Sequence, residues 1–177
     1  MGKAAAARDY AGSGMTIQQA MLDQIKRFPD KSARPNYVLW GGLQIKTGDT
    51  FAVPAEGGVR TEFLSSKGDV EQGFDLKLDG WIRLAKGEKV SLLRTWDDPR
   101  YEPMVEYPFH SNDGLLSVWN VYKVHYPAGR VAEEKWTDNA GMWVEEVSTA
   151  VRIYHCSHGL TRPPDFEALV FRLSIFG

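Results

Sequence analysis

The chain has 177 residues, a length that fits one domain with a sizeable buried core. Hydrophobic residues make up 43% and charged residues 25%, which argues against a disordered chain, and the net charge of −2 gives no general attraction to nucleic acid. Cys156 is the only cysteine, so no intrachain disulfide can form. No apolar run is long enough for a signal peptide or a membrane span, and we expect a soluble protein that is cytoplasmic as synthesised and has no membrane partner.

The first segment, residues 1–15, is rich in glycine and alanine and shows no apolar periodicity. Such a segment cannot bury enough surface to become ordered by itself, and it is predicted to be a flexible arm. An appended tail is an open alternative, because Met15 could be the native start.

Residues 16–36 are predicted to form one short amphipathic helix and a linker. Thr16 and Gln19 have the spacing of a capping box at a helix start, and Pro29 ends the pattern. The apolar residues between them fall on one helical face: Ile17, Met21, Ile25 and Phe28. A stripe this narrow on a short helix needs a surface to pack on. That surface is either the open end of its own domain or a neighbouring subunit, and we treat these four residues as interface candidates.

The remaining residues, 37–177, are predicted to form a β-sandwich. Short β-rich runs recur there between turn residues, at 37–46, 51–54, 59–65, 70–84, 89–96, 104–109, 115–126, 130–136, 142–155 and 166–176. The glycine pair inside the first run is interpreted as a bulge or a close backbone approach. Because no helical crossovers separate the runs, the strands should pair antiparallel. The fold class is therefore all-β, a jelly-roll or Greek-key-like antiparallel sandwich, and its last strand should lie inside a sheet.

The aromatic residues, 12% of the chain with six tryptophans, provide the clearest candidates for contact. Trp96, Tyr101 and Trp136 lie in or beside predicted turns. Exposed rings at the end of a sandwich can stack on sugars or form an interface hot spot, whereas buried rings simply fill the core. The sequence leaves these three interpretations open.

A metal site is suggested by the run His155-Cys156-Ser157-His158, with His110 or His125 as a more distant ligand. Neighbouring residues on a strand point to opposite faces, so the run does not converge on one ion unless the chain turns. A lone cysteine is also more often buried as a small apolar side chain. No metal ligand, cofactor or catalytic residue is therefore predicted.

Paired carboxylates such as Glu145-Glu146 invite a glycosidase interpretation, which requires two acids facing each other across a cleft. Consecutive acids on a strand face opposite ways, so each pair supplies one group to any single site. Solvated strand and loop faces are the favoured interpretation.

These observations favour a non-enzymatic structural protein that assembles with itself, such as a capsid, decoration, tail or spike subunit of a virus or phage. Residues 1–36 contain six lysines and arginines against three aspartates, which is weakly basic for packaging a genome. For such a structural protein we expect a homo-oligomer that is located in the virion after assembly. The alternative is a lectin-like module that binds a glycan, and the third candidate is a metal-dependent cupin-like enzyme using His110, His125, His155 or Glu145.

Overall fold

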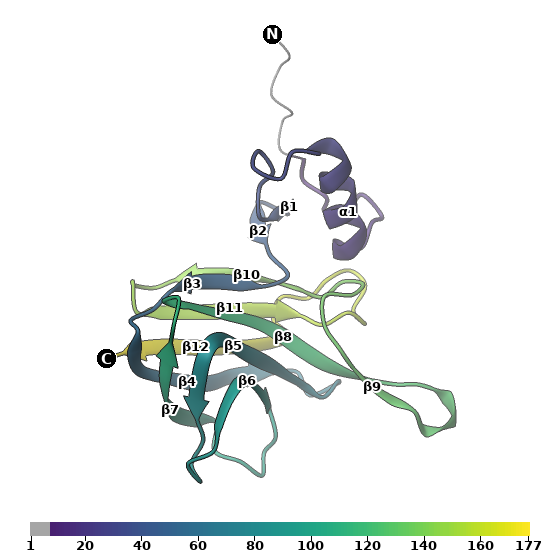
Figure 1. The fold of residues 1–177 in the computed structure, drawn as a ribbon. Coiled ribbons are helices and arrows are strands. Elements are labelled where there is room, and N and C mark those ends of the chain that lie inside the picture. Colours follow the sequence, from purple (N-terminus) through teal and green to yellow (C-terminus); the bar gives the residue numbers. More distant parts are fainter. Residues whose placement is uncertain (1–7) are drawn as a thin grey trace.

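The computed structural model describes residues 8–177, in which strands dominate and the single α-helix is short. The prediction of an all-β, antiparallel fold is confirmed (Figure 1). The helix is α1 (Ile17–Arg27), and a short 3₁₀ turn, η1 (Pro127–Gly129), lies in the connection between two paired strands, β8 and β9. The strands are β1 (Val38–Trp40), β2 (Leu43–Ile45), β3 (Asp49–Ala52), β4 (Glu56–Ser66), β5 (Gln72–Arg83), β6 (Lys89–Trp96), β7 (Met104–Ser111), β8 (Leu115–His125), β9 (Val131–Glu134), β10 (Gly141–Glu146), β11 (Val151–Ser157) and β12 (Leu169–Phe176).

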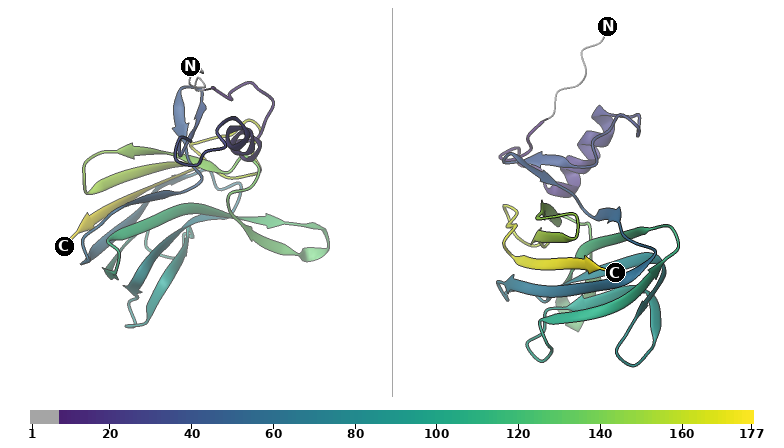
Figure 2. Two further views of the ribbon diagram at one scale, coloured as in Figure 1. Left: turned by 45° about the horizontal axis from the view of Figure 1, so that its top comes forward. Right: turned by 90° about the vertical axis from the view of Figure 1, so that its left-hand side faces the viewer.

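Ten of these strands form one antiparallel sheet with the order β10-β11-β12-β4-β7-β5-β8-β3, while β6 pairs with β5 and β9 with β8. The sheet curls into a near-closed barrel or flattened sandwich (Figure 2). Asp49 on β3, at one end of the strand order, contacts β11, which lies near the other end. Its carboxylate accepts a hydrogen bond from the Tyr154 hydroxyl of β11 at 2.8 Å and lies 3.3 Å from the Arg152 guanidinium. The last strand, β12, lies between β11 and β4, as predicted.

The curl depends on a bend in β5. Residues 72–77 of this strand pair with β8, whereas residues 80–82 pair with β7 along the same edge. Gly80 lies at the change of partner, with a φ of 144°. A Cβ at this position would lie 2.0 Å from the carbonyl oxygen of His110, so only glycine fits.

Inside the barrel, apolar side chains from both halves of the sheet pack into one core. Phe74, Phe171 and Tyr154 are buried and stack in sequence, with ring centroids 4.4 and 4.9 Å apart. This aromatic column fixes the distance between the two layers, and aliphatic residues fill the space around it.

A second, smaller core joins α1 and the β1–β2 hairpin to the outside of the barrel (Figure 1). Tyr10 is fully buried there, together with Ile17 and Val38, and Trp143 of β10 packs against them. The prediction of a flexible arm is therefore wrong for residues 8–15, while residues 1–7 lie outside the described part of the chain. Composition alone did not reveal that a single tyrosine anchors this segment.

Asp9 holds the same segment against the hairpin. Its carboxylate accepts hydrogen bonds from the amides of Ala11 at 2.9 Å, Gly41 at 2.9 Å and Gly42 at 2.8 Å. These hydrogen bonds lower the pKa of Asp9 below its ordinary value. The expected bulge at the glycine pair is in fact a two-residue hairpin turn, because both glycines have positive φ, 59° and 81°.

Two of the predicted strand runs were too long. The run 37–46 is the β1–β2 hairpin, and the run 142–155 is the β10–β11 hairpin, whose turn lacks a glycine or proline to mark it. The other runs match the observed strands to within a few residues at each end.

Candidate functional site

The candidate site is formed where α1 meets the loop between β9 and β10. The first turn of the helix is fixed to this loop, because the Ile17 amide donates to Asn139 Oδ1 at 3.1 Å and the Gln18 amide donates to the Asp138 carbonyl at 2.9 Å. The Asp138 amide in turn donates to Gln18 Oε1 at 3.0 Å. The predicted capping box of Thr16 and Gln19 is present. The helix therefore packs on its own domain rather than projecting from it.

The face that α1 buries differs from the predicted stripe. Ile17 is buried as expected, but Ala20 and Gln24 complete the buried face. Gln24 can be buried because its Nε2 donates to the carbonyls of Pro35, at 3.2 Å, and Tyr37, at 2.6 Å. Of the remaining predicted residues, Met21 and Phe28 are half-buried and Ile25 is 45% exposed.

The exposed side of α1 borders a groove of about 360 Å³. Leu22 and Ile25 of the helix are 55% and 45% exposed, and Trp136, which follows β9, is 44% exposed on the same groove. Met21, Arg34, Pro35, Asn36 and Thr47 complete its lining, together with the polar Gln18 and Gln24. Three of the interface candidates, Met21, Ile25 and Trp136, are thus brought together, although Trp136 is far from the other two in the sequence.

Trp136 is held in an uncommon backbone conformation. Its φ is 62° and that of Asp138 is 50°, in the left-handed region that costs a non-glycine residue about 1–2 kcal/mol. The indole packs edge-on against Trp119, with ring centroids 5.2 Å apart, and the Lys135 ammonium lies 4.5 Å from its centroid. The contact between Gln18 and Asp138 fixes the same loop. The contact with α1 therefore holds the loop in the conformation in which Trp136 is exposed to the solvent.

Behind Trp136 lies an ion pair with a buried carboxylate, which no pattern in the sequence predicts. Asp75 is fully buried, accepts two hydrogen bonds from Arg94 at 2.7 Å each, and accepts a third from Trp119 Nε1 at 2.8 Å. Arg94 also contacts Glu133 at 2.6 Å, and the hydrogen bonds to Asp75 and Glu133 raise the pKa of Arg94. This network fixes Trp119, the ring on which Trp136 rests.

The other aromatic candidates do not join this site. Trp96 packs against the barrel core beneath the Lys123 ammonium, which lies 4.7 Å from its ring centroid. Tyr101 is 70% exposed on the loop between β6 and β7, beside Arg100. The three rings proposed as a sugar platform therefore lie against three different neighbours.

The histidine and cysteine run is divided among separate environments. His155 stacks on Trp143 outside the barrel, and its ring nitrogens contact Glu167 at 2.9 Å and Glu145 at 3.1 Å, on opposite sides of the ring. Cys156 points into the core, where burial raises the pKa of its thiol well above the ordinary value. Across residues 8–177, the His, Cys, Asp and Glu side chains form no group of three or more that could hold a metal ion.

His158 lies apart from both of these residues. It is 1% exposed, and its Nδ1 accepts a hydrogen bond from the Leu160 amide at 3.1 Å. That bond leaves the proton of a neutral ring on Nε2, which faces Asp69 Oδ2 at 3.4 Å. The His158 side chain therefore stabilises the loop that follows β11.

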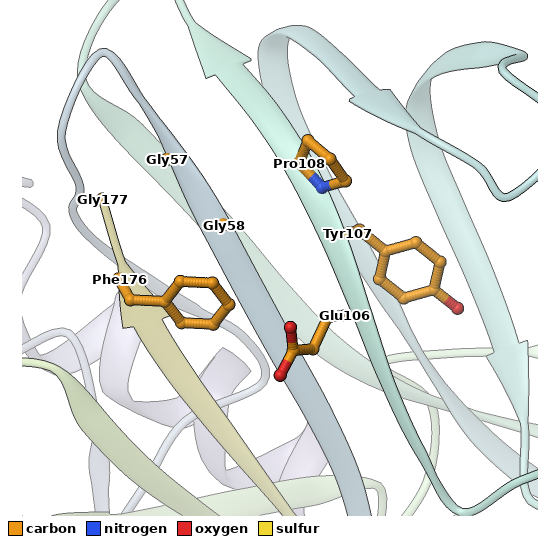
Figure 3. A pocket seen from close by; sticks show the side chains of 7 residues that line it. All are labelled: Gly57, Gly58, Glu106, Tyr107, Pro108, Phe176 and Gly177. Atoms are coloured by element: carbon orange, nitrogen blue, oxygen red, sulfur yellow. The ribbon is translucent and has the colours of Figure 1, made fainter.

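A second hollow, of about 330 Å³, lies over the outer face of β12, β4 and β7 (Figure 3). The Phe176 ring reaches over Gly58, where a Cβ would meet the ring at 2.5 Å. Beside it, Arg60 and Glu106 form an ion pair at 2.6 Å. These two charged groups therefore pair with each other beside the hollow.

Comparison with protein families, characterised proteins and solved structures found no match to this chain.

Within residues 8–177, α1 is far too short to cross a membrane, and no other helix there has the required length and apolarity.

Proposed function

We propose that this chain is a non-enzymatic structural protein that assembles with copies of itself, as a capsid, decoration, tail or spike subunit of a virus or phage particle. The observation that carries the proposal is the groove with its three exposed apolar side chains, Leu22, Ile25 and Trp136. Exposed apolar residues gathered around one hollow are typical of contact surfaces. The particle assignment rests on the layout, an N-terminal segment and helix ahead of a β-sandwich, which shell proteins share at the level of fold.

The size of the patch indicates the kind of assembly. Complete burial of a large apolar side chain contributes about 1.5–3 kcal/mol, and each of these three is already about half covered. The groove alone therefore supports a modest affinity. Modest contacts are sufficient in a particle, because a closed arrangement repeats the same interface many times.

Light scattering coupled to chromatography tests the proposal with a matched pair of variants. Leu22→Glu places a charge in the groove, whereas Leu92→Glu places one on β6, where Leu92 is 43% exposed but lies away from the groove. We expect Leu22→Glu to shift the native mass towards the 19.9 kDa of one chain and Leu92→Glu to leave it unchanged. Equal masses for both variants and the wild type would count against the groove as the contact.

Glycan binding remains the second candidate, and the exposure of Trp136 is the observation that favours it. A glycan array probed with the wild type and with Trp136→Ala separates the two functions. Binding that the substitution abolishes, in a chain whose native mass does not change, would favour the lectin-like function over assembly.

A further inference from the structure

The groove has charges of opposite sign at its two ends. At the N-terminal end of α1, Asp138 and Glu134 line an adjoining hollow that shares Gln18 with the groove, and Asp138 is exposed and hydrogen-bonded to Gln18. One lysine, Lys135, lies between these two acids in the sequence, with its ammonium over the Trp136 ring, so this end carries two acidic groups against one basic group. At the C-terminal end, Lys26 is exposed, and Arg34 lines the groove while donating to the Phe28 carbonyl at 2.9 Å. The apolar residues lie between these acidic and basic ends.

A surface with this order of charges is complementary to a second copy of itself that is related by a twofold rotation, which reverses the helix direction. Two copies of α1 placed antiparallel, with Leu22 and Ile25 packed in the middle, would place Lys26 of each copy opposite Met21 of the other. That position is about 4.5 Å along the helix from Gln18, so the long lysine side chain extends towards the acidic end of the other copy. A parallel arrangement would set like charges together. The helix dipoles also favour the antiparallel arrangement, because each positive N-terminus then faces a negative C-terminus.

A second hollow adjoins the groove at its acidic end. The adjoining hollow, of about 430 Å³, shares Gln18 with it and contains Tyr126 and Leu160, which are 36% and 47% exposed. A stable interface buries about 800 Å² on each partner, more than one helix face provides. The second hollow offers contact surface in addition to the helix face.

We propose that the occupant of the groove is α1 of a second copy of this chain, bound antiparallel about a twofold axis that passes between Leu22 and Ile25. This inference rests on the proposed self-assembly and specifies its geometry. The contact is isologous, so each copy contributes the same residues, and the basic end of one helix pairs with Asp138 of the partner copy. The twofold pair is the building block from which any larger assembly is made.

Site-specific cross-linking tests the position of the axis. Cys156 is fully buried, so a cysteine introduced on the surface is the only reactive thiol of the native chain. An axis between Leu22 and Ile25 places the two copies of residue 22 about 5 Å apart along the helices, within reach of a bismaleimide with a short spacer. We expect Leu22→Cys to give covalent dimers and Leu92→Cys, on β6, to remain uncross-linked.

The dependence of association on salt tests the orientation. In the antiparallel pair, added NaCl weakens wild-type association, because it screens attraction between Lys26 and Asp138 of the partner copy. Lys26→Glu should raise the dimer dissociation constant about tenfold at low salt, and added salt should then strengthen association because it screens a repulsion. Wild-type association that salt strengthens would indicate like charges in contact and would overturn the antiparallel arrangement.

The outcomes separate this inference from the proposed function. Native oligomers in which Leu22→Cys fails to cross-link would overturn the twofold helix pair and leave self-assembly standing. A chain that stays monomeric at every concentration would overturn both. Covalent dimers of Leu22→Cys together with the reversal of the salt effect in Lys26→Glu would support the inference.

Discussion

Tyr10→Ala tests whether the segment before α1 is part of the folded structure. The Tyr10 ring is 0% exposed, its hydroxyl donates to Asp23 Oδ2 at 2.7 Å, and the Arg8 guanidinium lies 5.2 Å from the ring centroid. Removal of a fully buried aromatic ring costs about 3–5 kcal/mol. This is a large part of the stability of an ordinary domain, about 5–15 kcal/mol. We expect the melting temperature to fall by about 10 °C.

Equilibrium unfolding in urea, followed by tryptophan fluorescence, measures this loss, because Trp40 and Trp143 pack against the cluster that contains Tyr10. Tyr10→Phe keeps the ring and removes the hydroxyl that donates to Asp23, so it should cost about 1–2 kcal/mol. Tyr101→Ala is the matched control: Tyr101 is 70% exposed, and the change should stay within about 0.5 kcal/mol. A Tyr10→Ala chain as stable as this control would refute the placement of residues 8–15.

Three further predictions concern the barrel and its hairpin. The pKa of Asp9 is lowered by its amide hydrogen bonds, so its contribution to stability is complete above the unfolded pKa of about 3.9 and is lost as the pH falls through the lower folded pKa. The Gly41 amide resonance should therefore shift only as the pH falls below that unfolded pKa in the wild type, and it should not shift in Asp9→Asn. Gly80→Ala should lower the free energy of unfolding by about 1–3 kcal/mol, because its Cβ would meet the His110 carbonyl, and an unchanged urea midpoint would contradict this. Cys156 should not react with a thiol reagent at pH 8 in the native state and should react fully in urea, since burial raises the pKa of its thiol; rapid native labelling would show that it is accessible.

The local elements of this fold could be predicted from the sequence. The capping box at Thr16 and the proline after Phe28 marked the ends of α1, and β6 was predicted at its observed bounds. These features depend on neighbouring residues, so a short window of sequence contains the information. The order of the strands depends on long-range pairing, as in the change of partner at Gly80, and no local pattern indicates it.

The candidate site was predicted only in part. Periodicity pointed to Ile25 and composition pointed to Trp136, but nothing in the sequence connected them. Leu22 was missed as a groove residue. Gln24 takes a buried position on α1 that helical periodicity would assign to an apolar residue, and Leu22 therefore lies on the exposed side of the helix. The conformation of Trp136 was also hidden, since its left-handed backbone is imposed by contacts of the loop with α1 rather than by a glycine.

The native mass of the wild-type chain, measured by sedimentation over a range of concentrations, tests the central claim most directly. Self-assembly through a twofold contact of α1 predicts oligomers whose masses are even multiples of 19.9 kDa, and it predicts that the fraction of oligomer over monomer rises with concentration. A single species of 19.9 kDa at every concentration would contradict the account.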